Sequence, residues 1–258
     1  MSERPLLVFD FDGVIVDGME EYWWSASTAA QQLLAPGTPA SSGAGVIPEQ
    51  FRQLRPWIHH GWEMVLLAAL LREPGSSLQR MGVAAFVAAY AEHCQQALER
   101  RGWSPSQLQG ALEQVRRAAV QGNRAQWLAR HQAFAGVSER LRRFSDEQVD
   151  WAVLTTKGRA FTAELLDGLS LDPVLLFGHE DGTKPEVLLR LQQERALIGF
   201  VEDRRPTLET VLATPGLEAL PCYLADWGYL RASDREALPE GIALLTLDQF
   251  PAPLADWP

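Results

Sequence analysis

Residues 5–14 read PLLVFDFDGV, and this stretch decides the fold. An unbroken apolar run from Pro5 to Phe9 ends at two aspartates, Asp10 and Asp12, and a glycine follows them. Apolar runs without alternating polar residues are typical of strands buried on both faces, as in parallel sheets. Glycine lets the backbone approach a ligand closely. We therefore predict a buried parallel strand whose carboxyl end carries two acidic side chains.

The second half of the chain repeats this pattern of short apolar runs. They span residues 149–154, 174–177, 197–201, 221–224 and 242–245. Helix-length segments separate several of these runs, at residues 159–168, 184–194 and 206–213. Strands that alternate with helices predict an α/β fold with a doubly wound, mostly parallel sheet.

The segment between the first strand and residue 135 has a different composition. Stretches rich in Ala, Gln, Leu and Glu, which favour helices, lie at residues 19–35, 60–72, 82–101 and 105–130. The Ala35–Pro48 stretch is rich in Gly, Ser and Pro and is expected to be a mobile loop. We therefore predict an α/β core, residues 1–17 and 136–258, interrupted by a helical domain at 18–135.

Composition excludes several classes of partner. The 258 residues carry a net charge of −10, and the pI is near 5.0, which argues against binding to nucleic acids or anionic membranes. The N-terminal residues MSERPLLVFDFDG lack the long apolar stretch of a signal peptide, and no window approaches the ~18–20 apolar residues of a membrane span. Two cysteines are too few for a disulfide framework. The sequence thus predicts a cytoplasmic protein, and it leaves room for a small phosphate ligand.

Two smaller predictions concern residues outside the strand ends. Asp17 stands three residues before Glu20, a spacing that indicates a capping box at the start of a helix. Cys94 lies in an Ala-rich helical stretch and Cys222 in a predicted strand, so both are expected to be buried and inert.

Four segments in a fixed order carry a family resemblance. They are DFDGV at 10–14 after the first strand, VLTTK at 153–157, GTKPE at 182–186 and GFVED at 199–203. In this order they resemble motifs I to IV of the haloacid dehalogenase (HAD) superfamily of phosphatases. The resemblance is to the branch that includes phosphoglycolate phosphatases, and it implies a Rossmann-like core.

The insert at residues 18–135 resembles a C1-type helical cap, and the segment Ala135–Val137 resembles the point where the chain re-enters the core. A cap of this kind implies a domain that excludes water and reads the leaving group of the substrate. We expect cap contacts with an anionic or sugar-like substrate from Arg52, Arg55, His59 or His60.

Phosphoryl transfer needs a nucleophile, charge neutralisation and a proton for the leaving group. Asp10 is ionised at neutral pH by its reference pKa and can attack phosphorus to give an aspartyl-phosphate. Asp12 can protonate the leaving group and then activate water. The resemblance implies a Mg²⁺ ion on Asp10, the backbone carbonyl of Asp12 and Asp203. Glu202 is expected to support these ligands without binding the ion directly.

The remaining candidate catalytic residues are expected to bind the phosphate. Lys184 would offset the negative charge of Asp10 and the phosphate, and Thr155 would donate its hydroxyl to a phosphate oxygen. Thr156 competes for that role, although Thr155 follows the apolar run directly. Lys157 is a second candidate for the cation, and it ranks below Lys184 because no Pro-started helix follows it.

Motif IV departs from the commoner pattern of Gly-Asp followed by a second Asp four residues later. Here the pair is Glu202-Asp203, and Thr207 holds the later position. We predict a hydrolase: a Mg²⁺-dependent phosphatase that acts on a small phosphorylated metabolite. A phosphomutase similar to β-phosphoglucomutase would use the same core, and a non-catalytic HAD-fold binding protein is the alternative from another class.

Overall fold

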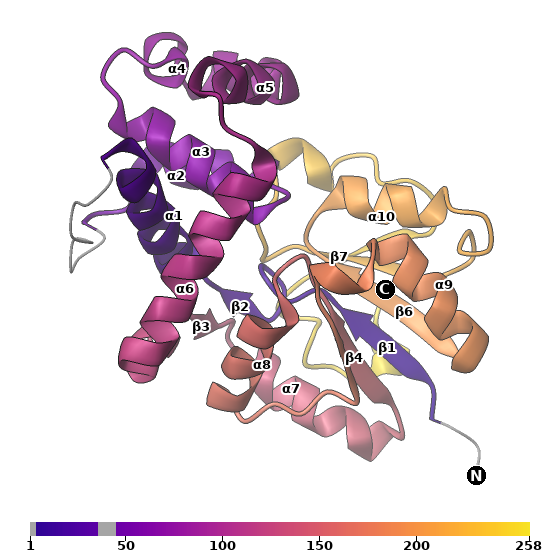
Figure 1. Ribbon diagram of the computed structural model, residues 1–258. Coiled ribbons are helices and arrows are strands. Elements are labelled where there is room, and N and C mark those ends of the chain that lie inside the picture. The colour runs from indigo at the N-terminus through magenta and orange to yellow at the C-terminus, as the bar shows by residue number, and fades with distance from the viewer. Residues whose placement is uncertain (1–3, 36–44) are drawn as a thin grey trace. The chain divides into compact units, whose positions relative to one another are not determined.

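The computed structural model describes residues 4–35 and 45–258, and it divides into two compact units (Figure 1). An α/β unit comprises Met1–Asp17 and Gln132–Pro258, and a helical unit comprises Gly18–His131. The loop predicted at Ala35–Pro48 falls largely on residues 36–44, which lie outside the described residues.

The α/β unit is built on a six-stranded sheet with the strand order β5-β4-β1-β6-β7-β8, and every neighbouring pair is parallel. In chain order the strands are β1 (Leu6–Phe9), β4 (Asp150–Leu154), β5 (Leu175–Phe177), β6 (Leu197–Glu202), β7 (Cys222–Ala225) and β8 (Ile242–Leu245). These are the six apolar runs, so the predicted doubly wound parallel sheet is confirmed.

Both faces of β1 are covered, which explains why its sequence does not alternate. Leu6 and Val8 belong to a core cluster with apolar residues of helices α9 and α10. Phe9 contacts the rings of Phe144 and Phe250 instead. Successive side chains of a strand point to opposite faces, so each face of the sheet requires apolar residues.

The helices of this unit are α7 (Val137–Arg143), α8 (Arg159–Gly168), α9 (Lys184–Glu194) and α10 (Arg205–Leu212), with short 3₁₀ turns η2 (Phe144–Glu147), η3 (His179–Asp181), η4 (Ala232–Arg235) and η5 (Leu254–Asp256).

The chain leaves and re-enters the α/β unit through two short antiparallel strands, β2 (Val16–Asp17) and β3 (Gln132–Ala133). The sequence placed the re-entry at residue 136. The structure places it at Gln132, because β3 pairs with β2 before α7 begins.

The capping box predicted at Asp17 is wrong. The first helix of the helical unit begins after Gly18, and no side chain forms a hydrogen bond that caps its start. Asp17 lies in β2, where its carboxylate accepts a hydrogen bond from the hydroxyl of Tyr229. Asp17 therefore pairs with Gln132 in a strand, although its spacing from Glu20 had predicted a helix cap.

The helical unit contains the four predicted helical stretches and one further helix. Its elements are α1 (Met19–Leu34), α2 (Glu49–Leu54), η1 (Arg55–Trp57), α3 (Gly61–Arg72), α4 (Ser77–Ala88), α5 (Tyr90–Arg101) and α6 (Pro105–Leu128). The sequence did not predict α2, and it merged α4 with α5 because neither Gly nor Pro marks the break at Ala89. None of the helices in the described residues has the length and apolar character that crossing a bilayer requires.

A buried ion pair joins α1 to α6 inside this unit. The guanidinium of Arg116 donates to both carboxylate oxygens of Glu21, at 2.8 and 2.7 Å. The indole N–H of Trp127 donates to the same carboxylate at 3.3 Å. A buried charge is tolerated when it is paired and hydrogen-bonded, as Glu21 is here.

Both cysteines are expected to resist thiol reagents in the folded protein. Cys94 and Cys222 are 3% and 1% exposed. Burial first, with help from Glu63 for Cys94 and from Glu202 for Cys222, raises the pKa of each thiol to about 12. We expect dithionitrobenzoate at pH 8 to label neither thiol in native buffer and both in denaturant. Rapid labelling of either cysteine in native buffer would contradict this prediction.

Candidate active site

The candidate residues meet at the carboxyl ends of three neighbouring strands. Because β1 lies between β4 and β6, the residues that follow these strands converge at one edge of the sheet. Asp10 follows β1, Thr155 follows β4 and Asp203 follows β6. In open α/β sheets this edge is the usual location of ligand sites.

Lys184 joins two buried carboxylates at this edge. Its Nζ lies 2.8 Å from Oδ1 of Asp10 and 2.5 Å from Oε2 of Glu202. Burial alone would lower the pKa of Lys184, but Asp10 and Glu202 outweigh it and raise the pKa, so the side chain stays an ammonium. A capping box between Thr183 and Glu186 fixes the start of α9, whose first residue is Lys184.

Asp10 is buried in an excess of negative charge. Burial first, and the neighbouring Glu202 second, raise the pKa of Asp10 to about 7, although Lys184 lowers it. Burial likewise raises the pKa of Glu202, again against the effect of Lys184. One ammonium thus faces several buried carboxylates, and a further cation would stabilise their ionised forms.

A divalent cation fits the oxygen atoms present. Among the described residues, Asp10, Glu202 and Asp203 each offer one carboxylate oxygen, and these oxygens lie within 4.8 Å of one another. Hard oxygen donors of this kind suit Mg²⁺. Glu202 already accepts from the N–H groups of Asp203 and Arg204 at 3.1 and 3.0 Å, and from Lys184. These bonds suit Glu202 to holding its neighbours in place more than to binding the ion.

Gly13 is required where motif I passes Asp203. Its φ of +92° lies in a region that side chains disfavour, and an added Cβ would lie 2.0 Å from Oδ2 of Asp203. The glycine therefore lets the backbone after Asp12 pass close to the acidic end of β6.

Lys157 pairs with the other motif I aspartate. Its Nζ lies 3.3 Å from Oδ1 of Asp12, and the lysine side chain is 2% exposed. The sequence treated Lys157 and Lys184 as competitors for one position. The structure gives them different partners, Asp12 for Lys157 and Asp10 for Lys184.

The two threonines of motif II differ in burial. Thr155 is 2% exposed, and its hydroxyl oxygen accepts the N–H of Lys157 at 3.1 Å. Because the hydroxyl acts as an acceptor in that bond, its hydrogen can still be donated to a phosphate oxygen. Thr156 is only partly buried. The geometry thus favours Thr155 as the donor.

Tyr229 is a site residue that the sequence did not predict. Its backbone N–H donates to Oδ2 of Asp203 at 2.8 Å, and its hydroxyl donates to Oδ1 of Asp17 at 2.6 Å. It lies in the loop after β7, in no recognisable motif, and only the order of the strands brings it beside Asp203.

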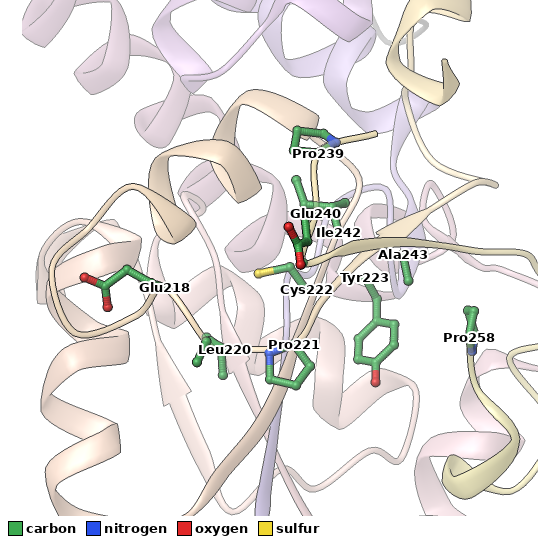
Figure 2. A pocket seen from close by; sticks show the side chains of 12 residues that line it. Glu218, Leu220, Pro221, Cys222, Tyr223, Pro239, Glu240, Ile242, Ala243 and Pro258 are labelled. Carbon is green, nitrogen blue, oxygen red and sulfur yellow. The ribbon is translucent and has the colours of Figure 1, made fainter. Parts of the chain in front are cut away.

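A surface cavity of about 410 Å³ lies at the other end of the strands (Figure 2). It surrounds the first residues of β7 and β8, Cys222 and Ile242, and carries the carboxylates of Glu218 and Glu240. None of the described residues that line it is a lysine or an arginine. These residues offer a phosphate no ammonium or guanidinium group, whereas Lys184 lies at the site around Asp10, so this cavity does not compete with that site.

The comparisons with known proteins identify the fold. No family model and no curated protein matches the chain. Solved structures that resemble it include a predicted phosphatase from Clostridium acetobutylicum, with 13% identity, a TM-score of 0.60 and 97% of each chain covered. A predicted phosphoglycolate phosphatase from Haemophilus somnus shares 15% identity, with a TM-score of 0.57 over 89% of this chain and 88% of that one. A putative haloacid dehalogenase-like hydrolase from Bacteroides fragilis shares 13% identity, with a TM-score of 0.55 over 95% and 99%. The chain therefore has the haloacid dehalogenase-like fold, as its four motifs indicated.

Proposed function

We propose that this protein is a Mg²⁺-dependent phosphatase that hydrolyses a small phosphorylated metabolite through an aspartyl-phosphate on Asp10. The observation that carries the proposal is the ammonium of Lys184 between Asp10 and Glu202, beside Asp203. A structural ion pair needs one carboxylate, whereas this cluster gathers three at the edge of the sheet where ligands bind. Its fold, shared with structures of phosphatases, supports the same reaction.

In the first step, a carboxylate oxygen of Asp10 attacks phosphorus, and the bond from phosphorus to the leaving oxygen breaks. Lys184 and the hydroxyl of Thr155 stabilise the phosphoryl oxygens, and Thr156 is a second candidate donor. Asp12 gives its proton to the leaving oxygen. The product of this step is an aspartyl-phosphate on Asp10 and a free alcohol.

In the second step, Asp12 takes a proton from water, which attacks phosphorus and releases inorganic phosphate. Asp10 returns to its carboxylate form. Lys157, at 3.3 Å from the Asp12 carboxylate, holds that side chain in place through both steps.

Mg²⁺ would be held by Asp10, Asp203 and the backbone carbonyl of Asp12, with Glu202 supporting these ligands. When bound, the ion offsets the negative charge of the phosphoryl group and the carboxylates. The excess of carboxylates over ammonium groups around Asp10 supports this assignment. We expect the helical unit to set specificity for the leaving group. The candidates there for contact with an anionic or sugar-like substrate are Arg52, Arg55, His59 and His60.

Turnover is expected to require a divalent ion. We expect purified protein to release phosphate from p-nitrophenyl phosphate with Mg²⁺, to lose this activity in excess chelator and to regain it when Mg²⁺ is restored. A panel of phosphorylated metabolites, assayed for inorganic phosphate, then identifies the substrate class.

Each other outcome of this experiment has a distinct meaning. Undiminished turnover in chelator would remove the metal from the proposal. Isomerised sugar phosphate with little free phosphate would make the protein a phosphomutase, and a panel without any turnover would favour a non-catalytic binding protein.

A further inference from the structure

The loop after β7, residues 226–230, touches both acidic motifs of the α/β unit. The indole N–H of Trp227 donates to the carbonyl of Val14 at 3.0 Å. The backbone N–H of Tyr229 donates to Oδ2 of Asp203, and its hydroxyl donates to Oδ1 of Asp17. We call residues 226–230 the β7 loop. It therefore contacts motif I, its following strand β2 and motif IV.

Gly228 brings the β7 loop against Asp203 without space for a side chain. A Cβ at this position would lie 2.2 Å from Cβ of Asp203 and 2.6 Å from the carbonyl oxygen of Gly13. The φ of Gly228 lies outside the left-handed region, so space and not backbone conformation requires the glycine. Gly13 and Gly228 thus both lie against Asp203, and neither position has space for a side chain.

We propose that the β7 loop is a positioning element for Asp203, with Tyr229 as its positioning residue. The N–H of Tyr229 fixes the direction of the Asp203 carboxylate, and the bond from its hydroxyl to Asp17 holds the loop in the position where that N–H reaches Asp203. This inference rests on the proposed function, in which Asp203 binds Mg²⁺. A ligand whose orientation is set before the ion arrives loses less conformational freedom when it binds.

The Tyr229 hydroxyl bond is also at the place where the chain leaves the α/β unit. Asp17 is the last residue of that part of the unit, and it pairs with Gln132, where the chain returns. One residue thus links the carboxylate at the end of β6 to the β2–β3 pair. Loss of the bond would leave the loop held by the bond from Trp227 to Val14 and by the backbone N–H of Tyr229.

The test compares Tyr229→Phe and Gly228→Ala with matched controls. Tyr229→Phe removes the bond to Asp17 and keeps the ring and the N–H. Its control is Tyr223→Phe in β7, a residue that lines the cavity of Figure 2 at the other end of the strands. The control for Gly228→Ala is Gly110→Ala in α6, where an added Cβ meets nothing within 4 Å.

The readouts are calorimetric titration of Mg²⁺ without substrate, the Mg²⁺-dependent rise in Tm, and the Mg²⁺ dependence of turnover. We expect Tyr229→Phe to weaken Mg²⁺ binding about three- to tenfold, and Gly228→Ala about tenfold or more. The KM for substrate at saturating Mg²⁺ and the behaviour of both controls should stay near wild type. A purely structural role would lower Tm equally with and without Mg²⁺ and leave the binding midpoint unchanged.

Failure of this inference is distinguishable from failure of the proposed function. If wild type binds Mg²⁺ and both variants bind it equally well, the positioning role is overturned and the phosphatase proposal stands. If wild type does not bind Mg²⁺, the metal assignment of Asp203 fails and the inference fails with it. If Gly228→Ala does not fold, the midpoint of Mg²⁺ binding by Tyr229→Phe alone decides whether the loop positions Asp203.

Discussion

Asp10→Asn is expected to abolish turnover and to leave the fold and most substrate binding intact. The amide has nearly the same shape as the carboxylate but cannot attack phosphorus, so the loss falls on kcat, by at least ~10³-fold. Lys184 keeps its ion pair with Glu202 in this variant, so no buried ammonium is left without a carboxylate. Steady-state kinetics, thermal unfolding and equilibrium binding of substrate would measure the three effects separately.

Asp172→Asn is the matched control for this variant, because Asp172 is exposed and lies in the same unit. Near-wild-type turnover of Asp10→Asn would mean that another group is the nucleophile. An independent check is to trap the wild type with beryllium fluoride, a mimic of the phosphoryl group. A crystal structure should then show the mimic on Asp10, and its presence on another side chain would overturn the assignment.

The sheet could be predicted from the sequence because its strands are buried on both faces. An apolar run such as Leu6–Phe9 carries this signal within four residues, without reference to its neighbours. The start of α9 was also a local signal, since Thr183, Pro185 and Glu186 form a capped first turn that presents Lys184. The same local sequence signals therefore predicted both the sheet and the motif residues at its edge.

Contacts that depend on strand order could not be predicted in the same way. Lys157 reaches Asp12 because β4 lies beside β1, and Tyr229 reaches Asp203 because β7 lies beside β6. Nothing in the composition of residues 226–230 indicates that order. The sequence thus identified residues that follow apolar runs and missed a residue whose role comes from its neighbour in the sheet.

The errors in the sequence interpretation have a related cause. Asp17 has the spacing of a capping box, yet pairing with Gln132, a residue far along the chain, places it in β2. Helix α2 (Glu49–Leu54) is short and follows the Gly-, Ser- and Pro-rich stretch, so its own composition gave too weak a signal. In both cases a tertiary contact or short length overrode local propensity. The cytoplasmic location and the roles of the site residues stay predictions.

Asp12→Ala is expected to slow phosphate esters with poor leaving groups far more than aryl esters. General acid catalysis contributes ~10²–10⁴-fold, and an aryl leaving group departs with little need of a proton. The variant keeps the backbone carbonyl of residue 12, so the proposed metal ligand there is not removed. The loss should therefore grow as the leaving group becomes more basic.

The measurement is kcat/KM for a graded series of aryl and alkyl phosphates. This quantity reports the steps up to formation of the aspartyl-phosphate, so the separate role of Asp12 in activating water does not enter it. Asp12→Asn, which keeps the size of the side chain and donates no acidic proton, should give the same dependence on the leaving group. Lys157 loses its carboxylate partner in both variants. If this change in the lysine were the only effect, kcat/KM would fall by the same factor for every ester. Equal losses across the series would thus remove Asp12 from the acid role, whereas losses confined to alkyl esters would assign the proton to its carboxyl group.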